Sequence, residues 1–219
     1  MHYSHYLCIV IDEKIVALEN VPVSTAVFST LYPRIRALNK KVGEIEKSGQ
    51  VIRLKKGLYV ANPKVSGVPL SVELIANHIY APSYVSMQSA LRFYGLIPEA
   101  VYTTVSMTLK HSRRFVNDVG RFEYVHISKE AFPIGLTRQR SGDAAFIIAT
   151  PEKALCDLIA GSSDVTLRYI SETRAYLEDY IRFDMDALPH LDRTVFEQYA
   201  EVGKKKSSIC TILKFLAHE

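Results

Sequence analysis

GQVIRLKKGLYVA, residues 49–61, joins two short strand patterns through a cluster of positive charge. The glycine between the strands, Gly57, can take the positive φ that a tight hairpin turn needs. The apolar positions of the strands are Val51, Ile52, Leu54, Leu58, Tyr59, Val60 and Ala61, and the cations are Arg53, Lys55 and Lys56. The stretch therefore predicts a β-hairpin whose tip is suited to contact phosphate.

Three helical segments are predicted ahead of this hairpin. Residues 11–21 and 24–32 have the pattern of short helices. Pro33 suits the first turn of a third helix and Gly49 suits its end, so we expect this helix over 33–49. Its apolar residues recur at helical spacing and are expected to face a core: Ile35, Leu38, Val42 and Ile45.

The polar face of the third helix is basic mainly in its N-terminal half. It is formed by Arg36, Lys40, Glu44 and Lys47, with Asn39 and Lys41 on its flanks. A helix that enters a DNA major groove by its N-terminal end needs this polarity, because only that end lies close to phosphates. Three helices followed by a basic hairpin are the order of a winged helix-turn-helix domain. The residues predicted to bind DNA are Arg34, Arg36, Asn39, Lys40, Lys41, Arg53, Lys55 and Lys56.

The distribution of charge supports this interpretation. The first 60 residues hold nine of the 27 basic and five of the 23 acidic residues, so the rest of the chain, with 18 of each, is neutral. Between 34 and 56 there are eight basic residues and two acidic ones. Such clustering is typical of a nucleic-acid-binding face, with a solvated helix face or a protein-binding winged domain as the alternatives.

Composition limits the class of protein. A chain of 219 residues with 48% hydrophobic residues can bury a core. No apolar run is long enough to cross a bilayer, and the run at 7–11 lacks the flanking features of a signal peptide. Three scattered cysteines, Cys8, Cys156 and Cys210, indicate no disulfide framework. We therefore expect a cytoplasmic protein that does not associate with membranes and has no cofactor.

The stretch ANPKVSGVP, 61–69, contains two prolines and a glycine and marks a boundary. We predict a DNA-binding domain over 1–62, a linker over 63–69 and an α+β domain over 70–219. The fold class is thus α+β, with a winged helix-turn-helix followed by a mixed domain that has a small sheet and a helical C-terminal part.

Within the second domain, strands are predicted at 101–109, 122–128 and 145–149. Ser86 and Thr150 are each expected to cap a helix. Further basic residues flank the strand patterns, and they belong either to a solvated edge, to an extended DNA path or to a surface for an acidic partner: Lys110, Arg113, Arg114, Arg121, Arg138 and Arg140.

One group of residues resembles a metal-dependent nuclease: Asp143, Glu152, Lys153 and Asp157. However, Glu152 and Lys153 are adjacent, whereas a strand needs one residue between them to place both on one face. Glu152 suits the positive end of a helix, and Lys153 with Asp157 is an ordinary i,i+4 pair. We therefore predict no catalytic residues and no enzyme activity.

His2, His5 and Cys8 have a spacing that suits a metal, but a fourth ligand is not evident. Histidines near an unanchored N-terminus are usually solvated, so we predict no metal site.

Three collinear stretches resemble successive blocks of the AbiEi family: EKSGQVIRLKKGLYV, APSYVSMQSALRFYGLIPE and ATPEKALCDLI. The resemblance covers roughly residues 10–160. It implies a bacterial antitoxin and transcriptional regulator, with an N-terminal winged helix-turn-helix that represses its own operon on double-stranded operator DNA. It also implies a C-terminal domain that neutralises a toxin similar to nucleotidyltransferases. The alternatives are a repressor without a toxin partner and, behind it, a metal-dependent nuclease.

Overall fold

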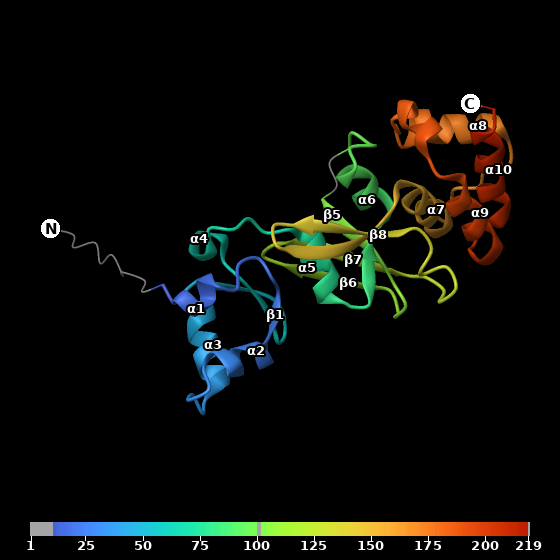
Figure 1. Ribbon diagram of the computed structural model, residues 1–219. Coiled ribbons are helices and arrows are strands. Elements are labelled where there is room, and N and C mark those ends of the chain that lie inside the picture. The colour runs from blue at the N-terminus through green and yellow to red at the C-terminus, as the bar shows by residue number, and fades with distance from the viewer. Residues whose placement is uncertain (1–10, 100–101, 219) are drawn as a thin grey trace. The chain divides into compact units, whose positions relative to one another are not determined.

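The computed structural model describes residues 11–99 and 102–218 (Figure 1). The chain divides into two compact units: 11–71 with 117–119, and the described part of 72–116 with 120–218. Within the described residues, no helix is long and apolar enough to cross a membrane. The segment predicted as a linker contains a short helix, α4 (Pro63–Ser66), which Asn62 caps by accepting a hydrogen bond from the Lys64 N–H.

The first unit combines short helices with a three-stranded sheet. Its elements are α1 (Glu13–Val16), β1 (Val23–Ser24), α2 (Thr25–Leu31), α3 (Leu38–Lys47), β2 (Val51–Lys55) and β3 (Leu58–Ala61), followed by α4. The strands lie in the order β1-β3-β2, and both pairs are antiparallel. Gly57 lies at the β2–β3 turn with a φ of 78°, and a bulge shifts the register between Arg53 and Lys55. The predicted hairpin is confirmed.

One apolar core joins the helices and the sheet of this unit. Phe28 of α2 is fully buried, and its ring meets the Tyr59 ring of β3 edge-on with centroids 5.6 Å apart. Val42 and Ile45 of α3 are each 2% exposed, as predicted. The core also includes Ile15, Val23, Tyr32, Val51 and Ala61. Because α3 and the hairpin share this core, their polar faces have a fixed relation to each other.

The third helix begins at Leu38 and not at Pro33. Tyr32 precedes the proline, whose ring disfavours the helical region for that residue, and it adopts φ −125° and ψ 60°. The Ile35 N–H then donates to the Tyr32 carbonyl at 3.1 Å in a turn. Ile35, predicted to face the core, is 39% exposed as a result. The first helix is also shorter than predicted, since α1 ends at Val16.

A six-stranded mixed sheet forms the centre of the second unit. Its strands are β4 (Ser83–Val85), β5 (Thr103–Thr108), β6 (Arg113–Asn117), β7 (Gly120–His126), β8 (Leu136–Ser141) and β9 (Ala144–Ala149), in the order β6-β7-β5-β4-β9-β8. β5 runs parallel to β7 and β4 parallel to β9, whereas β4–β5 and β8–β9 are antiparallel. β5, β7 and β9 confirm the three predicted strands. The other three were not predicted, so the sheet is larger than expected.

A helix residue completes the sheet where β4 ends. β4 pairs with β9 only between Val85 and Ile148. Next to this pair, the side chain of Asn77 from α5 (Val72–Ile79) donates to the Ile147 carbonyl at 3.1 Å and accepts from the Ile147 N–H at 2.6 Å. These two bonds satisfy the N–H and the C=O of Ile147 with a single side chain.

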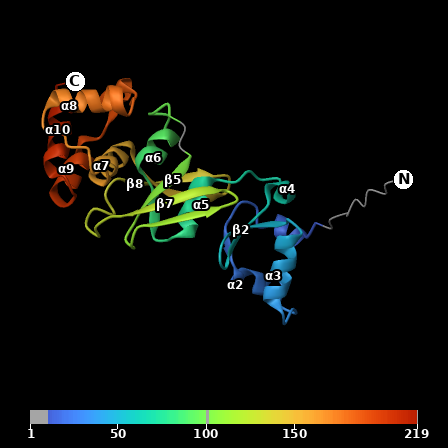
Figure 2. The same ribbon diagram turned by 180° about the vertical axis from the view of Figure 1, so that it is seen from behind.

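The remaining helices are α6 (Met87–Phe93), α7 (Pro151–Gly161), α8 (Ile170–Ala175), α9 (Arg193–Val202) and α10 (Lys206–Leu216), with a π-helical turn at Tyr176–Tyr180 and a 3₁₀ turn at Met185–His190. Figures 1 and 2 show α8, α9 and α10 gathered at the α7 end of this unit. Thr150 caps α7 as predicted, by accepting from the Lys153 N–H. Ser86 lies at the start of α6 but makes no capping bond, because its hydroxyl donates to Asp157.

Candidate nucleic-acid interface

A hollow of about 380 Å³ separates the polar side of α3 from the β2–β3 hairpin. Three of the residues predicted to bind DNA line it: Asn39 from α3, and Arg53 and Lys56 from the hairpin. The other lining residues are Thr25, Val42, Gly43, Glu46, Gly57 and Tyr59. We call this the α3–hairpin hollow. Asn39 thus meets Arg53 and Lys56, which follow it by 14 and 17 positions in the sequence, around one concave surface with the apolar core of the unit directly beneath.

Arg53 links the two walls of the α3–hairpin hollow. Its guanidinium lies 4.0 Å from the carboxylate of Glu46 on α3, and both side chains remain partly exposed. An exposed pair at this distance adds little stability. Its consequence is positional, because it holds a planar cation between the helix and the hairpin. A phosphate can replace the Glu46 carboxylate as the partner of the Arg53 guanidinium.

The remaining predicted residues of α3 divide between two sides of the helix. Lys40 is exposed on the outer side. Lys41 instead lies with Lys14 over the Tyr32 ring, at 5.5 Å and 5.0 Å from the ring centroid. The Tyr32 hydroxyl donates to Asp12 at 2.6 Å, and burial together with this bond raises the pKa of Tyr32 well above its ordinary value. Lys41 therefore belongs to a structural cluster on the α1 side.

Arg34 and Arg36 lie in the exposed turn that precedes α3, so neither belongs to the helix as predicted. Lys56 is exposed at the hairpin turn, and Lys55 ends β2 opposite Leu58. Ala37, the residue before α3, supplies no side-chain acceptor to the first N–H groups of the helix. Those groups carry the positive end of the helix dipole and remain suited to an anion.

The residues of the nuclease alternative do not form one site. Asp143 lies in the β8–β9 turn with its side chain 94% exposed, whereas the side chains of Lys153 and Asp157 have no exposed surface. Glu152 is buried and accepts a hydrogen bond from the Asp192 N–H. A substrate in solvent that reaches Asp143 cannot reach the buried pair.

Lys153 and Asp157 form the centre of a buried polar cluster. Lys153 Nζ lies 3.1 Å from Asp157 and donates to the Ala131 carbonyl at 2.7 Å. Asp157 also accepts from the hydroxyls of Tyr84 at 2.9 Å and Ser86 at 2.7 Å. Burial lowers the pKa of Lys153 and raises that of Asp157, while their mutual attraction opposes both shifts. The sequence marked the i,i+4 spacing of this pair but gave no sign that it is buried.

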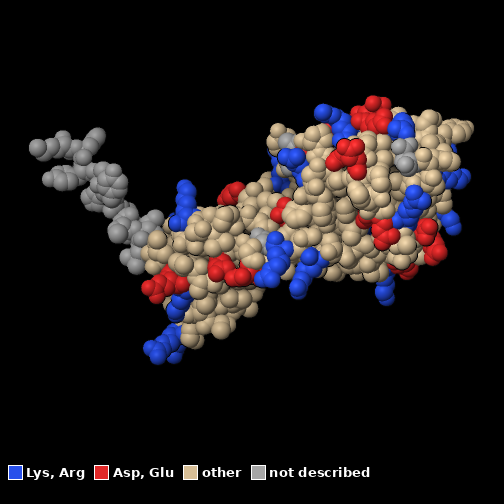
Figure 3. All heavy atoms as spheres, turned by 45° about the horizontal axis from the view of Figure 1, so that its top comes forward, with Lys and Arg blue, Asp and Glu red and all other residues tan. Residues whose placement is uncertain are grey.

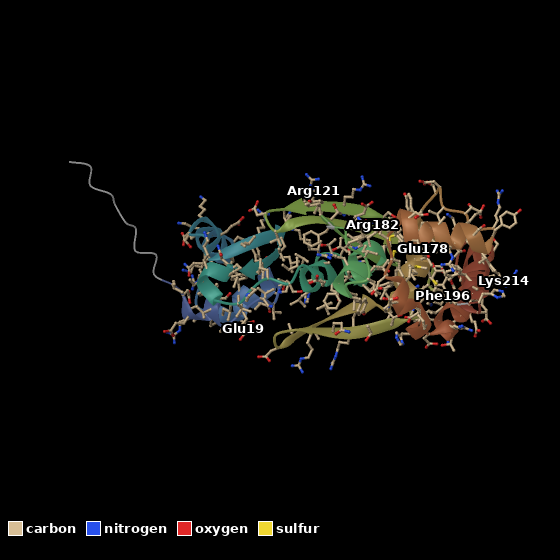
Figure 4. All side chains as sticks on the ribbon, turned by 90° about the horizontal axis from the view of Figure 1, so that it is seen from above. Glu19, Arg121, Glu178, Arg182, Phe196 and Lys214 are labelled. Atoms are coloured by element: carbon tan, nitrogen blue, oxygen red, sulfur yellow. The ribbon has the colours of Figure 1, made fainter. Side chains whose placement is uncertain are left out.

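The second set of basic residues does not form one patch. Arg113 and Arg114 lie on β6, and Arg138 and Arg140 lie on β8, at opposite edges of the sheet. Figure 4 shows the same separation, with Arg121 of β7 on the side of the sheet away from the β8–β9 hairpin. Arg114 is paired with Glu123 at 2.8 Å, and Lys110 donates to the Ala81 carbonyl. Figure 3 shows cations and anions interspersed over the visible face of this unit. His2, His5 and Cys8 lie outside the described residues.

The described residues therefore define an α+β protein with a cation-lined hollow in its first unit. Comparison with solved structures finds a similarity to the crystal structure of the RV2827C protein from Mycobacterium tuberculosis, with 11% sequence identity and a TM-score of 0.47. It covers 94% of this chain and 78% of that chain. No family model and no curated protein matches the chain.

Proposed function

We propose that the first unit is a winged helix-turn-helix domain and that the chain is a transcriptional regulator that binds double-stranded DNA. The observation that carries this proposal is the α3–hairpin hollow, around which Asn39, Arg53 and Lys56 converge from two elements. A recognition helix and a wing need this relation, because one must reach base edges while the other reaches phosphates of the same duplex.

In this proposal α3 enters the major groove with its N-terminal half. Asn39 and Lys40 lie in the first turn, where the uncapped N–H groups also favour anions, and the acidic Glu44 and Glu46 lie further along. Lys55, Lys56 and Arg53 of the hairpin contact the sugar–phosphate backbone. Arg34 and Arg36 reach phosphates from the preceding turn. Lys41 is excluded from the contact set because it packs over Tyr32.

We further propose that the second unit neutralises a nucleotidyltransferase-like toxin encoded beside this chain. This rests on the resemblance to the AbiEi family, whose second and third blocks meet in the core. Tyr84 and Ser86 from one block donate hydrogen bonds to Asp157 from the other. The matching stretches therefore share one structural unit. The proposal assigns no catalytic step to the chain, and a repressor without a toxin partner is the second candidate.

The test uses the full chain and the duplex that lies directly upstream of its own gene. We expect tighter binding to this duplex than to a random duplex of equal length, and repression of a reporter placed behind it. Equal affinity for both duplexes would contradict sequence-specific regulation. Co-expression with the product of the adjacent gene tests the antitoxin role: rescue of growth supports it, and a harmless neighbour favours the second candidate.

A further inference from the structure

Gly43 occupies a position in α3 that the fold itself does not reserve for glycine. It is the sixth of the ten helical residues, and its backbone is helical. Glycine is among the least favourable residues in a helix interior, because it loses the most conformational freedom on folding. Apart from its two chain neighbours and the local helix backbone, no heavy atom of the described residues lies within 4 Å of a Cβ built at Gly43. An alanine would fit and would favour the helix.

Apart from Gly120 at the start of β7, the other glycines in the described residues have an internal reason. Gly57 has a φ of 78°, which its hairpin turn requires. A Cβ at Gly135 would lie 2.7 Å from the side chain of Lys153, and one at Gly203 would collide with Tyr199. Gly43 has neither a positive φ nor a crowding neighbour. Unlike Gly120, it lies in a helix interior, where glycine is costly, and it lines a hollow, so the lack of a side chain here indicates a requirement from outside the chain.

The space beside Gly43 is part of the α3–hairpin hollow. Gly43 lines its helix wall, one turn after Asn39, and Arg53 and Lys56 line the facing wall. A stretch of bare helix backbone thus lies between an amide and two cations. Glycine is the residue that permits such close approach of a ligand to the backbone.

We infer that Gly43 is the point of closest approach between α3 and duplex DNA, and that its lack of a side chain is required by the DNA and not by the fold. This inference rests on the proposed DNA-binding function. It makes Gly43 a determinant of how deeply α3 enters the groove. A side chain added here would hold the helix away from the base edges that Asn39 and Lys40 are proposed to contact.

The experiment compares Gly43→Ala and Gly43→Leu with the wild-type chain, using the upstream duplex as probe and thermal unfolding as the measure of folding. Alanine and leucine are both good helix formers, so we expect the melting temperature to rise or stay unchanged. Affinity for the upstream duplex is expected to fall in order of side-chain size, by about tenfold or more for leucine, as overpacking of a close contact does.

A reference variant, Lys56→Ala, separates the two proposals. If wild type binds the upstream duplex, Lys56→Ala weakens binding and Gly43→Leu binds as tightly as wild type, the inference about Gly43 is wrong while DNA binding stands. If wild type does not bind duplex DNA, the proposed function itself fails. A loss of affinity accompanied by a lower melting temperature in both Gly43 variants would also overturn the inference, since the fold would then be what requires the glycine.

Discussion

Lys153 and Asp157, one turn apart on α7, form an ion pair of 3.1 Å with no exposed side-chain surface. The pair connects α7 to β4. Tyr84 of β4 donates a hydrogen bond to the Asp157 carboxylate, and its ring centroid lies 5.6 Å from the Lys153 ammonium group. The Tyr199 ring of α9 lies on another side, at 4.3 Å. The strand β4 and the helices α7 and α9 thus converge on two charges that are fully removed from water.

Replacing Lys153 alone should destabilise the second unit severely. The variant Lys153→Met leaves the Asp157 carboxylate buried without its cation, which costs about 3–5 kcal/mol. Urea unfolding measures the loss. The matched control is Glu178→Ala, which breaks the exposed i,i+4 pair of Arg174 and Glu178 and should cost about 0–1 kcal/mol. The double variant Lys153→Met with Asp157→Leu should recover much of the loss. A single-variant loss as small as that of the control would show that the pair is not a structural centre.

Asn39 and Lys40 are predicted to read base edges. Their alanine variants should lose preference for the upstream duplex over random DNA, since a good base-edge contact provides about 1–3 kcal/mol of discrimination. Lys41→Ala is the control, because this neighbouring cation of the same helix packs over Tyr32. Competition binding measures the preference. If Lys41→Ala relaxed the preference while Asn39→Ala and Lys40→Ala did not, the assigned face of α3 would be the wrong one.

Lys55 and Lys56 are predicted to contact phosphates without reading sequence. Removing either should weaken binding to specific and random duplexes equally, and should flatten the plot of log affinity against log salt by about one unit. Lys64→Ala, which removes an exposed cation from α4 of the same unit, is the control and should leave the slope unchanged. An unchanged slope in the Lys55 and Lys56 double variant would place the hairpin away from DNA.

The two proposed functions should separate between the hairpin and α5. The sequence predicts a domain boundary between Ala61 and Pro69, and the two compact units of the structure divide after Ser71. A fragment of residues 72–219 is expected to protect cells from the toxin without repressing the operon, whereas 1–71 should bind operator DNA without protecting. Co-expression and a reporter assay measure both. A folded 72–219 fragment that gives no protection where the full chain does would refute this division.

Several features that depend on neighbours in the sequence were predicted correctly, although the cap expected from Ser86 was not. Gly57 between two apolar runs predicted the hairpin, and Thr150 followed by Pro151 predicted the start of α7, because turn and cap chemistry act within a few residues. The apolar spacing of Val42 and Ile45 likewise predicted the buried face of α3. The prediction that this helix begins near Pro33 is wrong, since a proline also constrains the residue before it.

What only the tertiary structure decided depends on groups distant in the chain. The meeting of Asn39 with Arg53 and Lys56 requires the core that sets α3 against the hairpin. The polar strand β8 exists because β9 supplies its hydrogen bonds, and strand order alone sends Arg113 and Arg138 to opposite edges. The sequence determined which residues carry charge, since the charge of a side chain depends on its own residue type and not on its neighbours in space. Which charges converge, which are buried and which are kept apart was decided by non-local packing, where backbone hydrogen bonds and apolar burial outweigh local pattern.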